Sequence, residues 1–251
     1  MADTSTSART RTALITGSSS GIGLDIARAF LAAGYNVVLS GRDADRLAKA
    51  AAGLGHPERT ARVAGSIADR GTGEALVRTA LDRFGGLDVL VNNAGTFASR
   101  PFTEVSEEEL DGFLTGNLKG TYITTQAFVR AVREQGIGGS VVNIGTVLVD
   151  HGLAGFPASA PVVSKAGVHG LTTSLAAELA ADGIRVNLVA PGIIRTPLHK
   201  GSDVDSFGGL ALLNRVGEVS EISEAVLYLA EAEFITGHAL RVDGGHVIGR
   251  S

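Results

Sequence analysis

The chain has 251 residues, of which 44% are hydrophobic and 19% are charged, and its formal net charge is −4. This composition is typical of one α/β domain with a large core or of two small domains, and it gives no reason to expect nucleic acid or an anionic membrane as a partner. The absence of cysteine excludes disulfides, thiolate zinc sites and a cysteine nucleophile.

The N-terminal stretch, MADTSTSARTRT, has no apolar run like that of a signal peptide, and no apolar run in the chain has the length of a membrane span. We therefore expect a flexible segment over residues 1–11, no membrane contact and a cytoplasmic location.

Short apolar runs then alternate with longer helical patterns. Strands are predicted at 13–16, 36–40, 62–64, 88–91, 140–144, 185–189 and 239–242. Helices are predicted at 22–33, 43–53, 70–84, 107–134, 162–181 and 221–231, and Ser106 with Glu109 forms a capping box before one of them. Near-continuous Val/Ile/Leu strands separated by helices indicate a parallel sheet covered on both faces. Because no linker or repeat interrupts this pattern, we predict one doubly wound Rossmann domain of about seven strands over residues 12–251.

A glycine-rich turn follows the first predicted strand, in ALITGSSSGIGLDIARAF. Gly17, Gly21 and Gly23 lie between strand and helix, where glycines let the backbone turn tightly and approach a pyrophosphate. The N–H groups and the dipole of the helix that follows stabilise such an anion. The spacing alone also fits a simple strand-to-helix turn without a ligand.

The same residues satisfy the G-x-S-x-G pattern of a hydrolase through Ser19. That reading needs an acidic residue and then a histidine downstream. Asp243 and His246 come in this order but lie close together in a glycine-rich tail, which disfavours a hydrolase. His238 with these two residues lacks the ordered ligand spacing of a metal centre, so we predict no metal site.

Six motifs occur in the order and spacing of the short-chain dehydrogenase/reductase superfamily, which the chain resembles over residues 12–245. It is similar to the branch that includes the β-ketoacyl-carrier-protein reductases. The motifs are TGSSSGIG, NNAG at 92–95, Asn117 in GNLKG, SK at 164–165, RVNLVAPGIIRTPL at 185–198 and VDGG at 242–245.

The resemblance implies a nicotinamide cofactor. It assigns the phosphates to Gly17, Ser19, Gly21, Ile22 and Gly23, and the adenosine and central sheet region to Asn93, Ala94 and Gly95. It assigns the nicotinamide carboxamide and the diphosphate to Pro191, Gly192, Ile194 and Thr196.

The residues after the second strand bear on the choice of cofactor. Relatives that select NAD have an acidic residue where this chain has Gly41, and Arg42 follows. The absence of a carboxylate at Gly41 and the guanidinium of the adjacent Arg42 suit a 2′-phosphate, so we expect NADP(H) to be preferred over NAD(H). Arg42 could also be a solvated charge at a helix start. Ser66 departs from the family's pattern of an aspartate near the adenine.

The family's reaction centre is a set of Asn, Ser, Tyr and Lys, in which the lysine lowers the pKa of the tyrosine and binds the nicotinamide ribose. Asn117 and Lys165 fall in register, and Lys165 is also a cofactor ligand by this resemblance. Thr146 replaces the serine and keeps a hydroxyl that can donate to a carbonyl. Pro161 stands where the tyrosine should be, four residues before Lys165.

Pro161 suits the first turn of a helix, where its missing N–H costs nothing, so the fold should survive while the usual proton relay is lost. His151, in the loop before it, could act as the acid with Asp150 nearby, or it could be an exposed loop histidine. Tyr122 fits a packing aromatic better than a replacement acid.

Three functions are consistent with these residues. The favoured one is an NADP(H)-dependent oxidoreductase acting on a small carbonyl compound or secondary alcohol, with an atypical proton donor. The alternatives are a non-redox lyase, isomerase or cyclase, and a silent nucleotide-binding protein. The resemblance further implies a homotetramer and a mobile substrate lid over residues 199–213.

Overall fold

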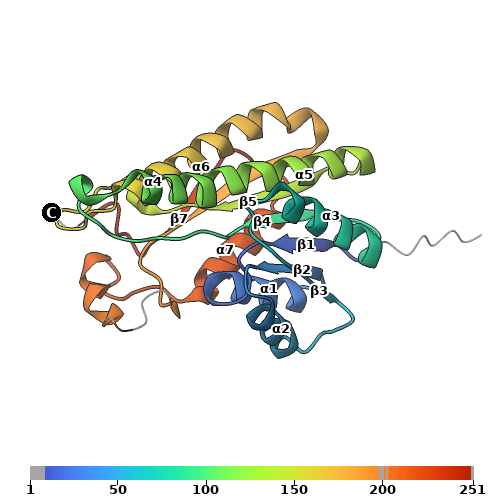
Figure 1. Ribbon diagram of the computed structural model, residues 1–251, viewed down its shortest axis with the longest axis horizontal. Helices are drawn as coiled ribbons and strands as arrows, with labels where there is room; N and C mark the ends of the chain where they lie inside the picture. The colour runs from blue at the N-terminus through green and yellow to red at the C-terminus, as the bar shows by residue number, and fades with distance from the viewer. Residues whose placement is uncertain (1–8, 198–200, 202, 250–251) are drawn as a thin grey trace, which may run out of the picture.

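Seven parallel strands form one sheet in the order β3-β2-β1-β4-β5-β6-β7 in the computed structural model, which describes residues 9–197, 201 and 203–249 (Figure 1). Residues 1–8 of the expected flexible segment 1–11 lie outside the described residues, while Arg9 and Arg11 form ion pairs with Asp88 and Glu231. The strands are β1 (Thr12–Ile15), β2 (Asn36–Gly41), β3 (Thr60–Ala64), β4 (Val89–Asn92), β5 (Gly139–Ile144), β6 (Ile184–Pro191) and β7 (Ala239–Val242). The predicted parallel sheet of about seven strands is therefore confirmed.

The sheet reverses its winding direction at β1, which pairs with β2 on one side and with β4 on the other. Ligands of such sheets bind beyond the carboxyl ends of the strands at this reversal point. Two strands are longer than predicted by two or more residues. β3 begins at Thr60, paired with Val37, and β6 continues to Pro191, paired with Val242, because pairing with a neighbouring strand holds residues outside the apolar runs.

Helices cover both faces of the sheet. They are α1 (Gly21–Ala32), α2 (Ala44–Gly53), α3 (Arg70–Phe84), α4 (Glu107–Phe113), α5 (Gly120–Gln135), α6 (Ser159–Glu178) and α7 (Val219–Glu231). Figure 1 shows α1, α2 and α7 on one face and α3, α5 and α6 on the other. Each face buries its own apolar cluster, with Phe30 of α1 in one and Phe128 of α5 in the other. Among the described residues, no helix is both long and apolar enough to cross a bilayer.

The predicted continuous helix 107–134 is interrupted. Its first turn carries the predicted capping box of Ser106 and Glu109, but a π-helical segment, Leu114–Lys119, separates α4 from α5. Wider turns of this kind are frequent at functional sites. Hydrophobic periodicity did not reveal the π-helical segment, because the apolar residues before and after it follow a similar helical spacing.

Pro161 is the third residue of α6, which begins at Ser159 rather than at the predicted residue 162. The first-turn N–H groups of a helix have no partner within it, so a proline there removes no helical hydrogen bond. The expectation that the fold tolerates Pro161 agrees with this position.

Candidate active site

The glycine-rich loop after β1 is closed against the residues that follow β4. Gly17 has φ +65°, and a Cβ there would lie 2.7 Å from the Cα of Ala94. The amide of Asn93 donates to the carbonyls of Thr16 and Gly17, at 2.9 and 3.1 Å. These two carbonyls are therefore turned into the protein, and a bulkier residue than glycine would open the loop.

The N-terminus of α1 has no side-chain cap. Its N-cap residue, Ser20, is extended, and its hydroxyl accepts no hydrogen bond from the first turn. The N–H groups of the first turn, from Gly21 to Gly23, can thus bind an anion with the help of the helix dipole. This loop fits the diphosphate of a dinucleotide.

The segment after β6 reaches the same loop. A Cβ on Gly21 would lie 3.8 Å from Thr196 Cβ and 3.6 Å from Pro197. Pro191 ends β6, the N–H of Gly192 donates to Val242, and buried Ile194 forms a bridge with Gly217. The structure therefore places the segment 191–196, which the family resemblance assigns to the nicotinamide carboxamide and the diphosphate, next to the glycine-rich loop. Of the predicted lid 199–213, residues 199, 200 and 202 lie outside the described residues, and 204–210 form a 3₁₀ helix.

Two arginines flank the end of β2. Arg42 is exposed, as expected for a residue that could meet a phosphate. One turn later, Arg46 of α2 donates to the hydroxyl of Ser20 at 2.5 Å. A Cβ on Gly41 would lie 3.3 Å from Ser19, so the glycine allows this close approach of β2 to the loop. Sequence reasoning missed Arg46, which lies four residues after Arg42 and within the predicted helix 43–53.

Asn117 lies in the π-helical segment and is fully buried. Its side-chain oxygen accepts from the N–H of Thr96 at 2.8 Å, and its amide donates to the carbonyl of Thr96 and to the hydroxyl of Ser164, both at 3.0 Å. Ser164 in turn donates to the carbonyl of Pro161 at 2.7 Å. Asn117 thus joins the loop after β4 to the first turn of α6.

Lys165 reaches across from α6 to the end of β5. Its ammonium donates to the carbonyl of Ile144 at 2.7 Å, and a Cβ on Gly95 would lie 3.3 Å from Nζ and 3.1 Å from Asn117 Oδ1. Burial lowers the pKa of Lys165 to about 8. The structure therefore places Gly95, predicted to contact the cofactor, next to Lys165 and Asn117, which were predicted at the reaction centre.

Thr146 follows β5 by two residues. Its hydroxyl oxygen accepts from the N–H of Leu148 at 3.3 Å and caps the 3₁₀ turn Val147–Val149. The side chain is only partly buried, and its hydroxyl proton remains available to a carbonyl oxygen.

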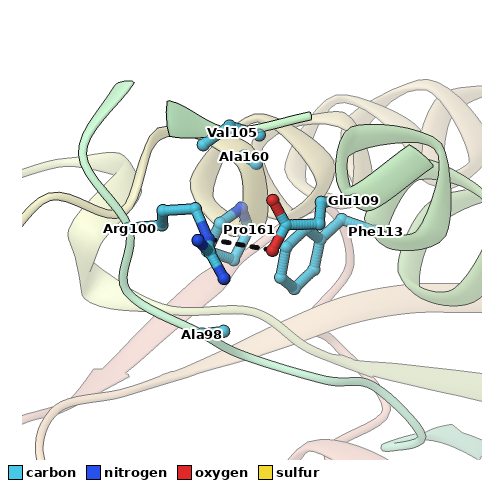
Figure 2. A pocket seen from close by; sticks show the side chains of 7 residues that line it. All are labelled: Ala98, Arg100, Val105, Glu109, Phe113, Ala160 and Pro161. Carbon is cyan, nitrogen blue, oxygen red and sulfur yellow. Dashed lines mark ion pairs between the residues drawn. The ribbon is translucent and has the colours of Figure 1, made fainter. Parts of the chain in front are cut away.

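Pro161 is buried beside a small hollow of about 10 Å³, shown in Figure 2. An ion pair between Arg100 and Glu109, 2.9 Å long, lies over the proline, and the ring of Phe113 lies beside it. The hollow is also lined by Ala98, Val105 and Ala160. The hollow holds no more than about one water molecule, so the space beside the proline is filled by other side chains.

His151 packs on the C-terminal tail. Its ring meets that of His246 edge-on, with centroids 5.5 Å apart. Asp150, which was expected to assist His151, forms an ion pair of 2.8 Å with Arg241 of β7. The role of His151 as an acid stays a prediction, and the structure gives it a second role in fastening the loop to the tail.

His169 lies one turn after Lys165 on α6. Its buried Nε2 has no hydrogen-bond partner among the described residues, and it would lie 2.7 Å from a Cβ on Gly145. Burial lowers the pKa of His169, while the nearby carboxylate of Asp150 opposes that shift. The spacing of four from Lys165 was the signal that could have found it.

Comparison with known proteins agrees with this arrangement. The family model described as "Enoyl-(Acyl carrier protein) reductase" matches residues 17–246. The 3-oxoacyl-[acyl-carrier-protein] reductase FabG of Thermotoga maritima is 36% identical over 244 residues, covering 94% of this chain and 97% of that protein. The (2S)-[(R)-hydroxy(phenyl)methyl]succinyl-CoA dehydrogenase subunit BbsD of Thauera aromatica is 38% identical, covering 94% and 96%. A crystal structure of a short-chain type dehydrogenase/reductase from Mycobacterium marinum matches with a TM-score of 0.90 and 31% identity, covering 94% and 95%.

Proposed function

Because the chain belongs to the short-chain dehydrogenase/reductase superfamily and is an oxidoreductase of carbonyl compounds or alcohols, we propose that NADP(H) is its cofactor and that its site works without a tyrosine. The observation that carries the choice of NADP(H) is the hydrogen bond from Arg46 to Ser20 in the glycine-rich loop. When bound, the nicotinamide supplies or accepts a hydride.

Charge at the end of β2 supports this choice. Arg42 and Arg46 offer two guanidinium groups beside the loop, and a guanidinium pairs well with phosphate oxygens. The nearest carboxylate along the chain, Asp43, is occupied because it accepts from the N–H of Arg46 and caps α2. Gly41 supplies no acid that would repel a 2′-phosphate.

The remaining polar groups hold the substrate and the ribose in this proposal. The Thr146 hydroxyl donates to the carbonyl oxygen of the substrate. Lys165 uses one N–H on Ile144 and keeps two for the nicotinamide ribose. Asn117 holds the loop at Thr96 and the first turn of α6 in register. His151 is the proposed proton donor. We further propose that the protein is a homotetramer and that residues 12–251 form a single domain.

One observation favours the alternative of a non-redox or silent protein, namely that Pro161 is packed under the Arg100–Glu109 pair. NADPH carrying deuterium at nicotinamide C4 separates the two readings. An oxidoreductase transfers the label to the carbinol carbon of the product. Tight NADPH binding with no label transfer to any of a panel of ketones would instead make the nucleotide a structural ligand.

A further inference from the structure

Two phenylalanines stack beside the candidate site. The rings of Phe97 and Phe156 are nearly parallel, with centroids 5.9 Å apart and an interplanar angle of 10°. Phe97 directly follows Thr96, whose backbone is held by Asn117. Phe156 belongs to the loop between Thr146 and α6. The stack therefore joins the loops after β4 and β5 next to the residues assigned to the chemistry.

The loop that carries Phe156 is fixed by its backbone. The carbonyl of Pro157 accepts from the hydroxyl of Ser99 at 2.7 Å and from the N–H of Arg100 at 2.9 Å. The Phe156 side chain is nevertheless 37% exposed. The ring is thus held in place while part of it remains uncovered, which is the state of a preformed apolar contact.

More apolar side chains come from the segment after β6. Phe207, Leu212 and Leu213 are exposed, and Leu212 packs on Gly245 of the C-terminal tail, where a Cβ would lie 2.9 Å from it. In Figure 1 this orange segment lies at the same end of the molecule as α4. Exposed apolar side chains therefore gather at the same end of the molecule as α4, on the segment after β6 (Figure 1).

Three arginines near the candidate site are paired with carboxylates. Arg100 pairs with Glu109, Arg241 pairs with Asp150, and Arg195 pairs with Asp205 and Glu218. A substrate that carries phosphate or carboxylate groups gains its affinity from cations that are free to pair with it. These three arginines would have to break existing ion pairs to serve such a substrate.

We propose that the substrate is a neutral ketone with a flat aromatic or fused-ring body that packs on Phe97 and Phe156, or the corresponding secondary alcohol. Aromatic faces stack in offset arrangements that stabilise a planar ligand beyond the burial of its surface. In the reduction, the ketone carbon takes a hydride from NADPH and its oxygen takes one proton, which yields the alcohol and NADP⁺. This inference rests on the proposed oxidoreductase function.

The test compares β-tetralone with a linear methyl ketone of the same carbon number and with acetoacetyl-CoA, in the full chain with NADPH. We expect kcat/KM to be highest for β-tetralone. Phe97→Leu and Phe156→Leu remove a ring but keep an apolar side chain, so each should lower kcat/KM for β-tetralone by about two- to tenfold. The linear ketone should change by less than about twofold. Phe234→Leu is the matched control. This fully exposed ring lies in the loop between α7 and β7, which leads into the amino end of β7 and so lies at the other end of the strands from the candidate site.

Binding of β-naphthol gives a readout that does not depend on turnover. The chain has no tryptophan, so the fluorescence of the ligand is measured on a low protein background. Phe97→Leu should weaken this binding, and Phe234→Leu should not. A preference for acetoacetyl-CoA, or equal losses for the ring and linear ketones, would overturn the inference while leaving the redox function intact. Ring-dependent binding of β-naphthol, without reduction of any ketone or oxidation of any alcohol, would show that Phe97 and Phe156 form an aromatic-binding surface, but it would overturn both the ketone assignment and the redox proposal.

Discussion

The ammonium of Lys165 donates a hydrogen bond to the carbonyl of Ile144 at a distance of 2.7 Å. This bond connects the second turn of α6 to the carboxyl end of β5. The family resemblance implies a tyrosine at the position of Pro161, whose pKa the lysine would lower. We therefore propose that Lys165 has no phenol to act on in this protein.

Lys165→Met should weaken NADPH binding in parallel with turnover, because we expect the lysine to act mainly by holding the ribose. A hydrogen bond to a charged group contributes about 1.5–3 kcal/mol, which sets the expected loss of binding free energy. Calorimetric titration with NADPH and steady-state rates measure the two effects. Turnover that disappears at unchanged NADPH affinity would make Lys165 a direct catalytic group instead.

Lys165 should also give the apoprotein a specific pH dependence of stability. Burial lowers its pKa from the ordinary 10.5 to about 8, so between these values the unfolded chain binds a proton that the folded chain has released. The free energy of unfolding therefore rises with pH across this window, and the cost of the buried charge is fully present below pH 8. Urea unfolding from pH 7.5 to 10.5 should show this rise in the parent and a smaller one in Lys165→Met. Equal slopes in both proteins would contradict burial as the cause.

Arg46→Ala and Arg42→Ala should each weaken NADPH binding by about 1.5–3 kcal/mol, the range for charge-assisted hydrogen bonds, with little effect on NADH. The 2′-phosphate is the only group that distinguishes the two nucleotides. Lys49→Ala is the matched control, since this exposed cation lies on the same helix, α2, beyond Arg46. If NADPH and NADH bind equally well and neither arginine matters, the cofactor assignment is wrong.

Pro161→Tyr should place a phenol one helical turn before Lys165, on the same face of α6. General acid–base catalysis typically contributes about 10²–10⁴-fold, so a weak ketone reductase activity should rise at least about tenfold. The Arg100–Glu109 pair and Phe113 must move to admit the ring, since the hollow beside Pro161 is only about 10 Å³. Pro161→Phe requires the same movement without the hydroxyl and should give no gain.

His151→Gln supplies the counter-test in the parent. Turnover should fall steeply if the histidine has taken over as acid, and Pro161→Tyr should then add little. A gain from the tyrosine together with indifference to His151→Gln indicates a silent or non-redox relative. Since His151 also packs on His246, thermal unfolding must show that the variant remains folded.

Gly145→Ala should destabilise the protein, because its Cβ would lie 2.7 Å from both His169 Nε2 and a methyl group of Leu188. Overpacking of this kind costs about 1–3 kcal/mol, measured as a lower midpoint of urea unfolding. Adding His169→Ala should recover part of the loss, since it removes one of the two clashes. No recovery would show that the backbone or Leu188, not the imidazole, limits the space.

The sequence by itself determined the seven strands, most helix bounds and the glycine-rich loop, whereas the register of Asn117, Pro161 and Lys165 was predicted from the family resemblance. The strands, helices and loop are local features, because apolar periodicity reports the element and glycine reports a positive φ. A spacing of four on a helix likewise places Pro161 and Lys165 on one face.

Only the tertiary structure decided which distant side chains meet. It brought Arg46 to Ser20, turned His151 onto His246, and stacked Phe156 on Phe97. It also replaced one long helix by two with a π-helical segment around Asn117. Such contacts depend on how crossovers and loops pack at the carboxyl edge of the sheet, and a pattern of neighbours along the chain carries no record of that packing.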